Sequence, residues 1–228
     1  MRVECLPASE AGIVGQVNVV IVGGHGKIGM RLAKLLAERG DSPRGIIRKT
    51  EQAPDLEAIG AEPFVLDIEN VDDISDALAG SDAVVFAAGA GPGSGPARKR
   101  TVDYGGAVKL ADAAKAQDIS RYVIVSSIGS NRTETWSDQM RPYQEAKSEA
   151  DKYLVQSGLD YTILRPGGLT DDPGTGKVQL GERLEYGQVT RDDVAAVIAA
   201  CLTADNSIGK ACDLMNGDTP IAEAVAAL

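Results

Sequence analysis

Tyr143 and Lys147 have the residue types and the spacing of an acid–base pair. They lie in the segment Tyr143-Gln144-Glu145-Ala146-Lys147, and residues four apart on a helix share one face. A lysine ammonium near a phenol favours the phenolate, so that a tyrosine can exchange a proton near neutral pH. An ordinary helix with an exposed lysine has the same spacing, so the pair needs further support.

A glycine-rich turn near the N-terminus could hold a phosphorylated ligand. The apolar run 17–22 leads into Gly23-Gly24-His25-Gly26-Lys27-Ile28-Gly29 and then into an amphipathic stretch, 30–40. Strand, glycine turn and helix in this order are typical of a dinucleotide-binding unit, in which a pyrophosphate lies on the N–H groups at the helix start. A flexible loop is the alternative. Because strand and helix are both evident, we predict nucleotide binding by Gly23, His25, Gly26, Lys27, Ile28 and Gly29.

The end of the second apolar run distinguishes the two nicotinamide cofactors. A carboxylate at this point bonds the ribose of NAD, whereas a basic residue accommodates the 2′-phosphate of NADP. This chain has Arg48 and Lys49 there, and a guanidinium can meet a phosphate with two parallel hydrogen bonds. We therefore predict NADP in preference to NAD, with a solvated surface pair as the alternative.

Two further strand ends supply candidate cofactor contacts. Asp67-Ile68 follows the third apolar run and is placed to bond and pack against adenine. Ala87-Ala88-Gly89 follows the fourth and offers small residues where the backbone passes close to a cofactor. Simple turn chemistry is the alternative for both.

The elements that position these residues alternate along the chain. Apolar runs alternate with amphipathic ones, which predicts an α/β fold, a doubly wound parallel sheet with helices on both faces. We expect helices over 71–78, 98–117 and 142–156, a strand over 121–127 and turn-rich sequence over 166–188. Residues 1–16 form an N-terminal extension without the apolar core of a secretory signal. Residues 17–228 form one domain, with a small C-terminal substrate lobe over 166–188 and 205–228.

Bulk composition narrows the possible partners. The 228 residues carry a net charge of −10, which argues against general binding to nucleic acids or anionic membranes. The three scattered cysteines suit reduced thiols in the cytoplasm, and a single histidine, His25, argues against a zinc centre. We expect a small-molecule substrate and no metal; monomer and homodimer both remain open.

Taken together, these motifs resemble an atypical short-chain dehydrogenase/reductase of the NAD(P)-binding, NAD-dependent epimerase/dehydratase-like kind. The similarity covers about residues 17–228. The segments that carry it, all in the expected order, are 23–29, Val125-Ser126-Ser127, Tyr143 with Lys147, Ser157-Gly158-Leu159-Asp160-Tyr161-Thr162-Ile163-Leu164-Arg165-Pro166-Gly167 and Val189-Thr190-Arg191-Asp192-Asp193-Val194-Ala195.

The resemblance implies a Rossmann fold and a role for each of the candidate site residues. Tyr143 would be the acid/base, Lys147 would favour its phenolate and hold the nicotinamide ribose, and Ser127 would orient a substrate carbonyl. Many members of the family carry this serine at the position where this chain has Ile128. Ser126 and Ser130 are therefore kept as alternatives to Ser127, and Ser126 is also a candidate cofactor contact. The chain also departs at Gly24-His25, where Ala-Thr is common. The loop Pro166-Gly167-Gly168-Leu169 would back the nicotinamide.

The resulting expectation is an NADP-dependent oxidoreductase that transfers hydride between the nicotinamide and a small carbonyl or hydroxyl compound. One alternative is a non-catalytic NADP sensor with a regulatory partner. A sugar-nucleotide epimerase or dehydratase is less favoured, because only about 60 residues follow Pro166, fewer than an independent domain needs.

Overall fold

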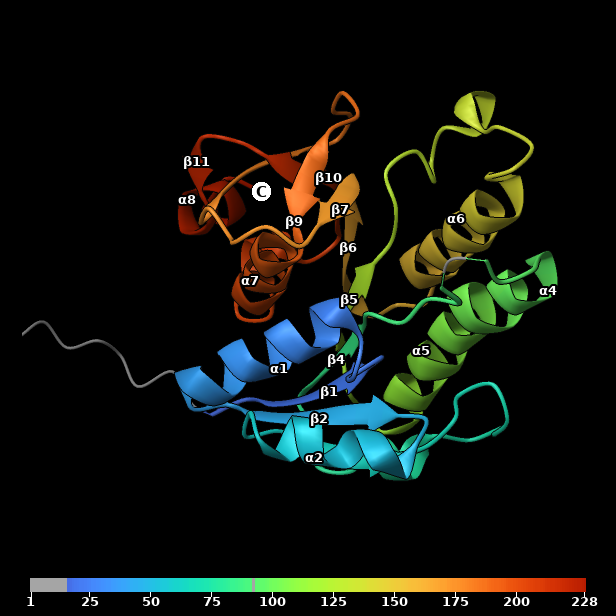
Figure 1. Ribbon diagram of the computed structural model, residues 1–228, viewed down its shortest axis with the longest axis vertical. Helices are drawn as coiled ribbons and strands as arrows, with labels where there is room; N and C mark the ends of the chain where they lie inside the picture. Colours follow the sequence, from blue (N-terminus) through green and yellow to red (C-terminus); the bar gives the residue numbers. More distant parts are fainter. Residues whose placement is uncertain (1–15, 92) are drawn as a thin grey trace, which may run out of the picture.

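The computed structural model describes residues 16–91 and 93–228 (Figure 1). Except for Gln16, the predicted N-terminal extension lies outside these residues, and so does Cys5. No helix among the described residues is both long enough and apolar enough to cross a membrane.

A nine-stranded sheet in the order β11-β8-β10-β6-β5-β4-β1-β2-β3 forms the centre of the molecule. Seven adjacent strands of the sheet pair with one another in parallel. They are β1 (Asn18–Val22), β2 (Ser42–Ile47), β3 (Glu62–Val65), β4 (Ala83–Phe86), β5 (Arg121–Val125), β6 (Asp160–Pro166) and β10 (Lys210–Asn216). The chain order reverses at β1, which lies between β2 and β4. The predicted doubly wound parallel sheet is confirmed, and ligands of such folds bind where the order reverses, at the carboxyl ends of the strands.

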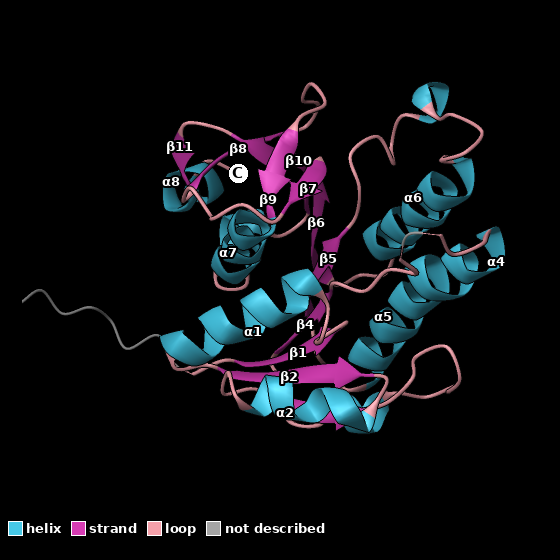
Figure 2. Cartoon of the chain, in the orientation of Figure 1, coloured by secondary structure: helices cyan, strands magenta, loops and turns pink. Residues whose placement is uncertain are grey.

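Helices cover both faces of the sheet (Figure 2). On one face lie α1 (Lys27–Arg39), α2 (Ala53–Glu57), α7 (Arg191–Cys201) and α8 (Ile221–Ala226). On the other lie α3 (Ser75–Leu78), α4 (Pro96–Arg98), a π-helical segment (Lys99–Gly106), α5 (Ala107–Ala116) and α6 (Arg141–Gln156). Short 3₁₀ turns span Thr50–Gln52, Thr133–Thr135 and Asp205–Ser207.

Strand β1 shows why an uninterrupted apolar run becomes a central strand. Successive side chains of a strand point to opposite faces. Val19 and Ile21 accordingly pack under α1 and α7, whereas Val20 and Val22 pack under α3 and α5. All four are at most 1% exposed, and full burial of such a side chain stabilises the fold by about 1.5–3 kcal/mol.

Two predicted helices differ in detail from the structure. The segment 98–117 is helical, but it begins at Pro96 and its first half is π-helical. The helix expected over 71–78 is confined to Ser75–Leu78. Its shortening has a local cause, because the Asp73 carboxylate accepts hydrogen bonds from the backbone and hydroxyl of Ser75 at 2.9 and 2.7 Å and so closes a turn.

The segment 166–188, expected to be turn-rich, contains short strands. Strands β7 (Gly168–Thr170) and β9 (Gln188–Thr190) pair in parallel, while β8 (Lys177–Gly181) pairs antiparallel with β10 and with β11 (Thr219–Pro220). In β8 the apolar residues that point inward are Val178 and Leu180. An alternation of two residues is too short to distinguish a strand from a loop in the sequence. The assignment of this segment to a substrate lobe stays a prediction.

Candidate functional site

The glycine turn between β1 and α1 is built by close backbone contacts. Gly23 has a φ of +85°, a conformation that favours glycine, and its carbonyl accepts a hydrogen bond from the N–H of Gly26 at 2.8 Å. A Cβ on Gly29 would lie 2.3 Å from the Gly23 oxygen, so only glycine lets α1 start here. The first N–H groups of α1 therefore point out of a bare backbone turn, and these are the donors that a pyrophosphate uses.

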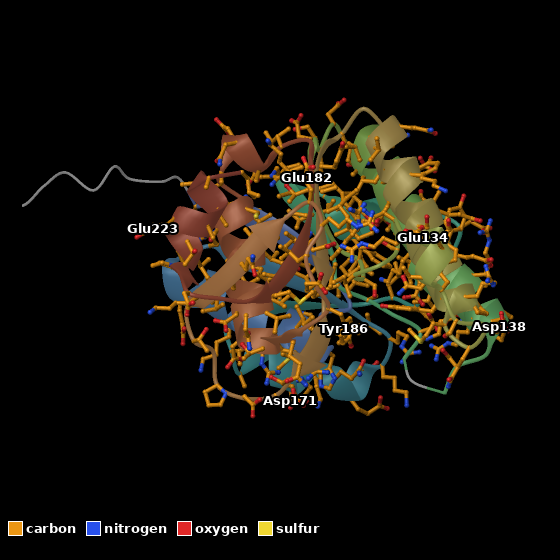
Figure 3. The ribbon with its side chains drawn as sticks, turned by 90° about the horizontal axis from the view of Figure 1, so that it is seen from above. Glu134, Asp138, Asp171, Glu182, Tyr186 and Glu223 are labelled. Atoms are coloured by element: carbon orange, nitrogen blue, oxygen red, sulfur yellow. The ribbon has the colours of Figure 1, made fainter. Side chains whose placement is uncertain are left out.

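The polar side chains of this turn contact neighbouring loops. His25 contacts Asp55 through Nε2 at 2.7 Å and Gln52 through Nδ1 at 3.1 Å, so its ring is fixed at the turn. Lys27 pairs with Asp171, the residue after β7, and Arg191 lies 3.0 Å from the same carboxylate. The hydrogen bond from Lys27 holds the pKa of Asp171 below its usual range. Asp171 is marked in Figure 3.

A pocket of about 210 Å³ lies beside the turn, over the carboxyl ends of β1, β2, β3 and β4. It brings together most of the residues predicted to contact the adenosine half of a cofactor. They are Gly23, His25, Gly26, Arg48, Asp67, Ile68, Ala87, Ala88 and Gly89. Lys49 does not line this pocket, and its N–H is bonded to the Gln52 side chain at 3.2 Å.

Four charged side chains line this pocket, here called the adenosine pocket after its predicted ligand: Arg48, Asp67, Glu69 and Arg98. Arg48 is exposed and forms no ion pair with any described residue. Glu69, missed by sequence reasoning, also lines the pocket and accepts hydrogen bonds from Arg98 at 2.9 Å and Thr101 at 2.7 Å. Burial raises the pKa of Glu69, but these donors outweigh it and hold that pKa below its ordinary value. Asp67 bonds its own turn, accepting from Glu69 N–H at 3.1 Å.

The exposed Arg48 and the bare glycine turn fit a dinucleotide cofactor of the NAD(P) kind. A guanidinium without a carboxylate partner can give both of its parallel donors to a phosphate. A pyrophosphate can approach the turn closely because its glycines carry no side chains. The residues present therefore fit the cofactor predicted from the sequence.

Lys147 lies on the buried face of α6, and two groups hold its ammonium. Its ammonium donates to the Val125 carbonyl at 3.0 Å and lies 3.3 Å from Oδ1 of Asp103. Lys147 is 3% exposed and Asp103 is fully buried. The Tyr143 ring centroid is 5.9 Å from the Lys147 ammonium and 5.1 Å from that of Lys99, so two cations lie near one phenol. Sequence reasoning missed Asp103 and Lys99, because the π-helical segment that positions them has no sequence signal of its own.

The three candidate serines have different surroundings. Ser126 and Ser130 are 3% and 0% exposed; their hydroxyls lie 3.4 Å apart, and Ser130 donates to Asp151 at 3.0 Å. Arg165 donates to the same carboxylate at 2.9 Å, and burial raises the pKa of Asp151. Ser127 is only partly buried and its hydroxyl donates, at 3.4 Å, to the carbonyl of Ile128. Among the three, Ser127 has the hydroxyl that an incoming ligand could reach.

The loop Pro166–Leu169 lies at the carboxyl end of β6 and is fixed by backbone contacts. Gly167 donates to the Leu214 carbonyl at 3.2 Å, and Gly168 donates to Gly187 at 2.8 Å. A Cβ on Gly167 would lie 2.4 Å from the Gly187 oxygen, while Leu169 packs on the core. The loop is thus a rigid floor beside the Tyr143 region rather than a mobile flap.

A doubly wound sheet with this glycine turn and a Tyr-Lys helix defines an NAD(P)-binding protein of the atypical short-chain dehydrogenase/reductase class. The chain belongs to the NAD(P)H-binding family, whose model matches residues 23–205.

Known proteins resemble the chain over nearly its whole length. The "uncharacterized sugar epimerase YhfK" of Bacillus subtilis is 43% identical over 211 residues, covering 92% of this chain and 99% of that protein. A solved putative NAD-dependent epimerase/dehydratase from Bacillus halodurans has a TM-score of 0.89 at 40% identity, covering 93% and 100% of the two chains. The oxidoreductase ylbE from Lactococcus lactis has a TM-score of 0.83 at 33% identity, covering 92% and 96%.

Proposed function

We propose that the protein is an NADPH-dependent reductase of a carbonyl compound, with Tyr143 as the proton donor. The observation that carries this proposal is the proximity of the Tyr143 ring to two ammonium groups, whose nitrogens lie 5.1 Å (Lys99) and 5.9 Å (Lys147) from the ring centroid. Two ammonium groups this close to one tyrosine ring support a role for Tyr143 in proton transfer.

The chain's own residues account for the proton. NADPH, when bound, supplies a hydride to the carbonyl carbon. The phenolic O–H of Tyr143 breaks and its proton goes to the carbonyl oxygen, so that an alcohol forms and the phenolate is later reprotonated from water. Ser127 donates a hydrogen bond to the carbonyl oxygen and orients it. Lys147, fixed by Val125 and Asp103, stabilises the phenolate and holds the nicotinamide ribose.

Arg48 supports NADP rather than NAD as the preferred cofactor. It is the exposed cation at the rim of the adenosine pocket, where a 2′-phosphate would lie. Glu69 is hydrogen-bonded by Arg98 and Thr101, and although the charge of Arg48 also lowers the pKa of Glu69, the two form no ion pair. Lys49 adds a charge nearby without lining the pocket.

Partners and location follow as further proposals. We expect a small-molecule substrate and neither nucleic acid nor membrane as a partner, in keeping with the net charge of −10. The thiols of Cys201 and Cys212 are free and buried, which agrees with a cytoplasmic location.

The experiment is NADPH oxidation, followed at 340 nm, over a panel of aldehydes and ketones for wild type and Tyr143→Phe. We expect kcat to fall at least about 100-fold in the variant, since a positioned acid contributes about 10²–10⁴, while NADPH still binds. The matched control is Tyr161→Phe, at the opposite end of the sheet on β6, which keeps the wild-type rate. Equal rates for wild type and Tyr143→Phe contradict the proposal. Tight NADPH binding with no turnover of any compound favours the sensor alternative.

A further inference from the structure

A second pocket, the side pocket, is lined by the residues that follow Ser127 and Tyr143 in the sequence. It has a volume of about 760 Å³ and lies between the loop after β5 and the loop joining β8 to β9. Both loops rise at the top of Figure 1. Ile128 and Gln144, the residues that directly follow Ser127 and Tyr143, line its inner end. The side pocket therefore borders the two segments that carry Ser127 and Tyr143, although neither of these residues is part of its lining.

Large apolar side chains are exposed in this pocket. Trp136 lines one side, and its ring is fixed because its indole N–H donates to the Gly129 carbonyl at 2.7 Å. Tyr186, labelled in Figure 3, lines the other side and is 75% exposed, and Met140 is 43% exposed. Concave sites lined by exposed aromatic and apolar side chains are where organic ligands bind.

The wall that carries Tyr186 is formed without a ligand. Asp213, which is fully buried, accepts a hydrogen bond from the Leu184 N–H at 2.9 Å and pairs with Arg132. Arg132 in turn donates to the Leu184 carbonyl at 3.1 Å. Both backbone groups of Leu184 are thereby tied to the sheet, so the loop keeps its shape when the pocket is empty.

Both arginines that line the side pocket are already paired, Arg132 with Asp213 and Arg183 with Glu134 at 3.4 Å. A carboxylate or phosphate on the ligand would have to displace one of these partners. Glu185, also in the lining, forms no ion pair with a described residue and would repel an anion. The pocket thus disfavours an anionic ligand.

Gln144 leaves one acceptor unused. The residue is 8% exposed, and its Nε2 donates to the Ile128 carbonyl at 3.1 Å. Because a carbonyl oxygen can only accept, this contact fixes the amide orientation. The opposite atom, Oε1, has no partner among the described residues. A buried acceptor without a donor is unfavourable, and a ligand hydroxyl or N–H would satisfy it.

We propose that the side pocket takes a neutral, planar aromatic carbonyl compound that carries a hydrogen-bond donor. The ring lies between Trp136 and Tyr186, and the donor bonds Oε1 of Gln144. This substrate class rests on the proposed reductase function, since the carbonyl has to face Tyr143.

Trp136 is the only tryptophan of the chain, so its fluorescence reports binding without any turnover. We would titrate the NADP⁺-saturated protein with 6-hydroxy-2-naphthaldehyde and with 2-naphthaldehyde, correcting for absorption by the probes. The oxidised cofactor prevents reduction. We expect quenching by both probes, with the hydroxylated one binding about fivefold tighter, the size of one neutral hydrogen bond. Cyclohexanecarbaldehyde should bind more weakly than either.

Two variants test the contacts separately. Gln144→Leu should abolish the preference for the hydroxylated probe, whereas the control Gln139→Leu, outside the pocket lining, should keep it. Tyr186→Ala should weaken both probes several-fold and leave their ratio unchanged; since Tyr186 is 75% exposed, this variant keeps the proposal testable even when Gln144→Leu does not fold.

The possible failures can be told apart. Absence of quenching, equal binding of the aliphatic aldehyde, or a preference retained in Gln144→Leu overturns the side-pocket proposal. Loss of turnover in Tyr143→Phe would in that case still support the reductase. Gln144-dependent binding without NADPH oxidation by any carbonyl compound would instead support the pocket and overturn the reductase.

Discussion

The ammonium of Lys147 lies 3.3 Å from Oδ1 of Asp103, and neither side chain is more than 3% exposed. Lys147 comes from α6 and Asp103 from the π-helical segment that precedes α5. Segments of this kind are frequent at functional sites. The carboxylate pairs with an ammonium that burial alone would disfavour, so Asp103, together with the Val125 carbonyl, holds Lys147 in position.

Replacing Asp103 should therefore destabilise the protein strongly. We expect Asp103→Asn to lower the free energy of unfolding by about 3–5 kcal/mol, because it leaves a buried ammonium without a counter-charge. Urea unfolding at pH 7 measures the loss. The matched control is Glu149→Gln, which removes the exposed partner of Arg100 and should cost at most about 1 kcal/mol.

A double variant separates the charge from the packing. Asp103→Leu combined with Lys147→Met should be more stable than Asp103→Asn, since a buried ion pair can be replaced by apolar residues at little cost. A stability of Asp103→Asn within experimental error of wild type would show that the pair does not hold Lys147 in place.

Much of the fold follows from local pattern. The run Val19–Val22 is apolar at every position because both faces of β1 are covered, and such runs indicate a central parallel strand. The residues that follow β1, β2, β3 and β4 could be grouped into one cofactor pocket in advance, because parallel strands bring their carboxyl ends to one edge of the sheet.

Contacts between distant loops could not be anticipated in this way. Asp103 looks like any polar residue of an amphipathic helix, and its burial depends on the π-helical geometry. Glu69 meets Arg98, and Asp213 meets Arg132, 81 residues away. Each of these pairs joins a loop residue, Glu69 or Arg132, to a distant helix or strand, and no spacing along the chain encodes such a contact.

Gly29 offers a test of the glycine turn. Alanine within a helix is ordinarily more stable than glycine by about 0.5–1 kcal/mol. A Cβ at this position would lie 2.3 Å from the Gly23 oxygen, so we expect Gly29→Ala to destabilise the protein by about 1–3 kcal/mol and to weaken NADPH binding. Thermal unfolding and fluorescence titration measure the two effects.

The control is Gly95→Ala. A Cβ on Gly95 would meet nothing within 4 Å, and its φ is −71°, so stability and NADPH affinity should stay near the wild-type values. A Gly29→Ala variant as stable as wild type would mean that α1 can shift away from β1 without cost.

Arg48 should determine the choice between the two cofactors. Removing charge-assisted hydrogen bonds to the 2′-phosphate costs about 1.5–3 kcal/mol, so Arg48→Asp should weaken NADP binding about 10- to 100-fold and shift preference towards NAD. Calorimetric titration with both cofactors gives the ratio. Lys49→Asp, a change of the same charge beside the pocket but outside its lining, should alter the ratio much less. An unchanged ratio in Arg48→Asp would refute the assignment.

The two buried thiols should make the protein lose stability in alkali. Burial raises the pKa of Cys201 to about 11 and that of Cys212 to about 12, whereas an unfolded thiol titrates near about 8.5. Above that lower value the unfolded chain releases protons that the folded chain keeps, so the free energy of unfolding falls by up to about 1.4 kcal/mol per pH unit for each thiol. Below about pH 8.5, where the thiols are protonated in both states, the protein keeps its full stability.

Urea unfolding between pH 8 and 10 tests this expectation. The free energy of unfolding should decline more steeply for wild type than for Cys201→Ala/Cys212→Ala, in which Cys5 still titrates. Equal slopes would mean that these thiols ionise in the folded protein as readily as in the unfolded one.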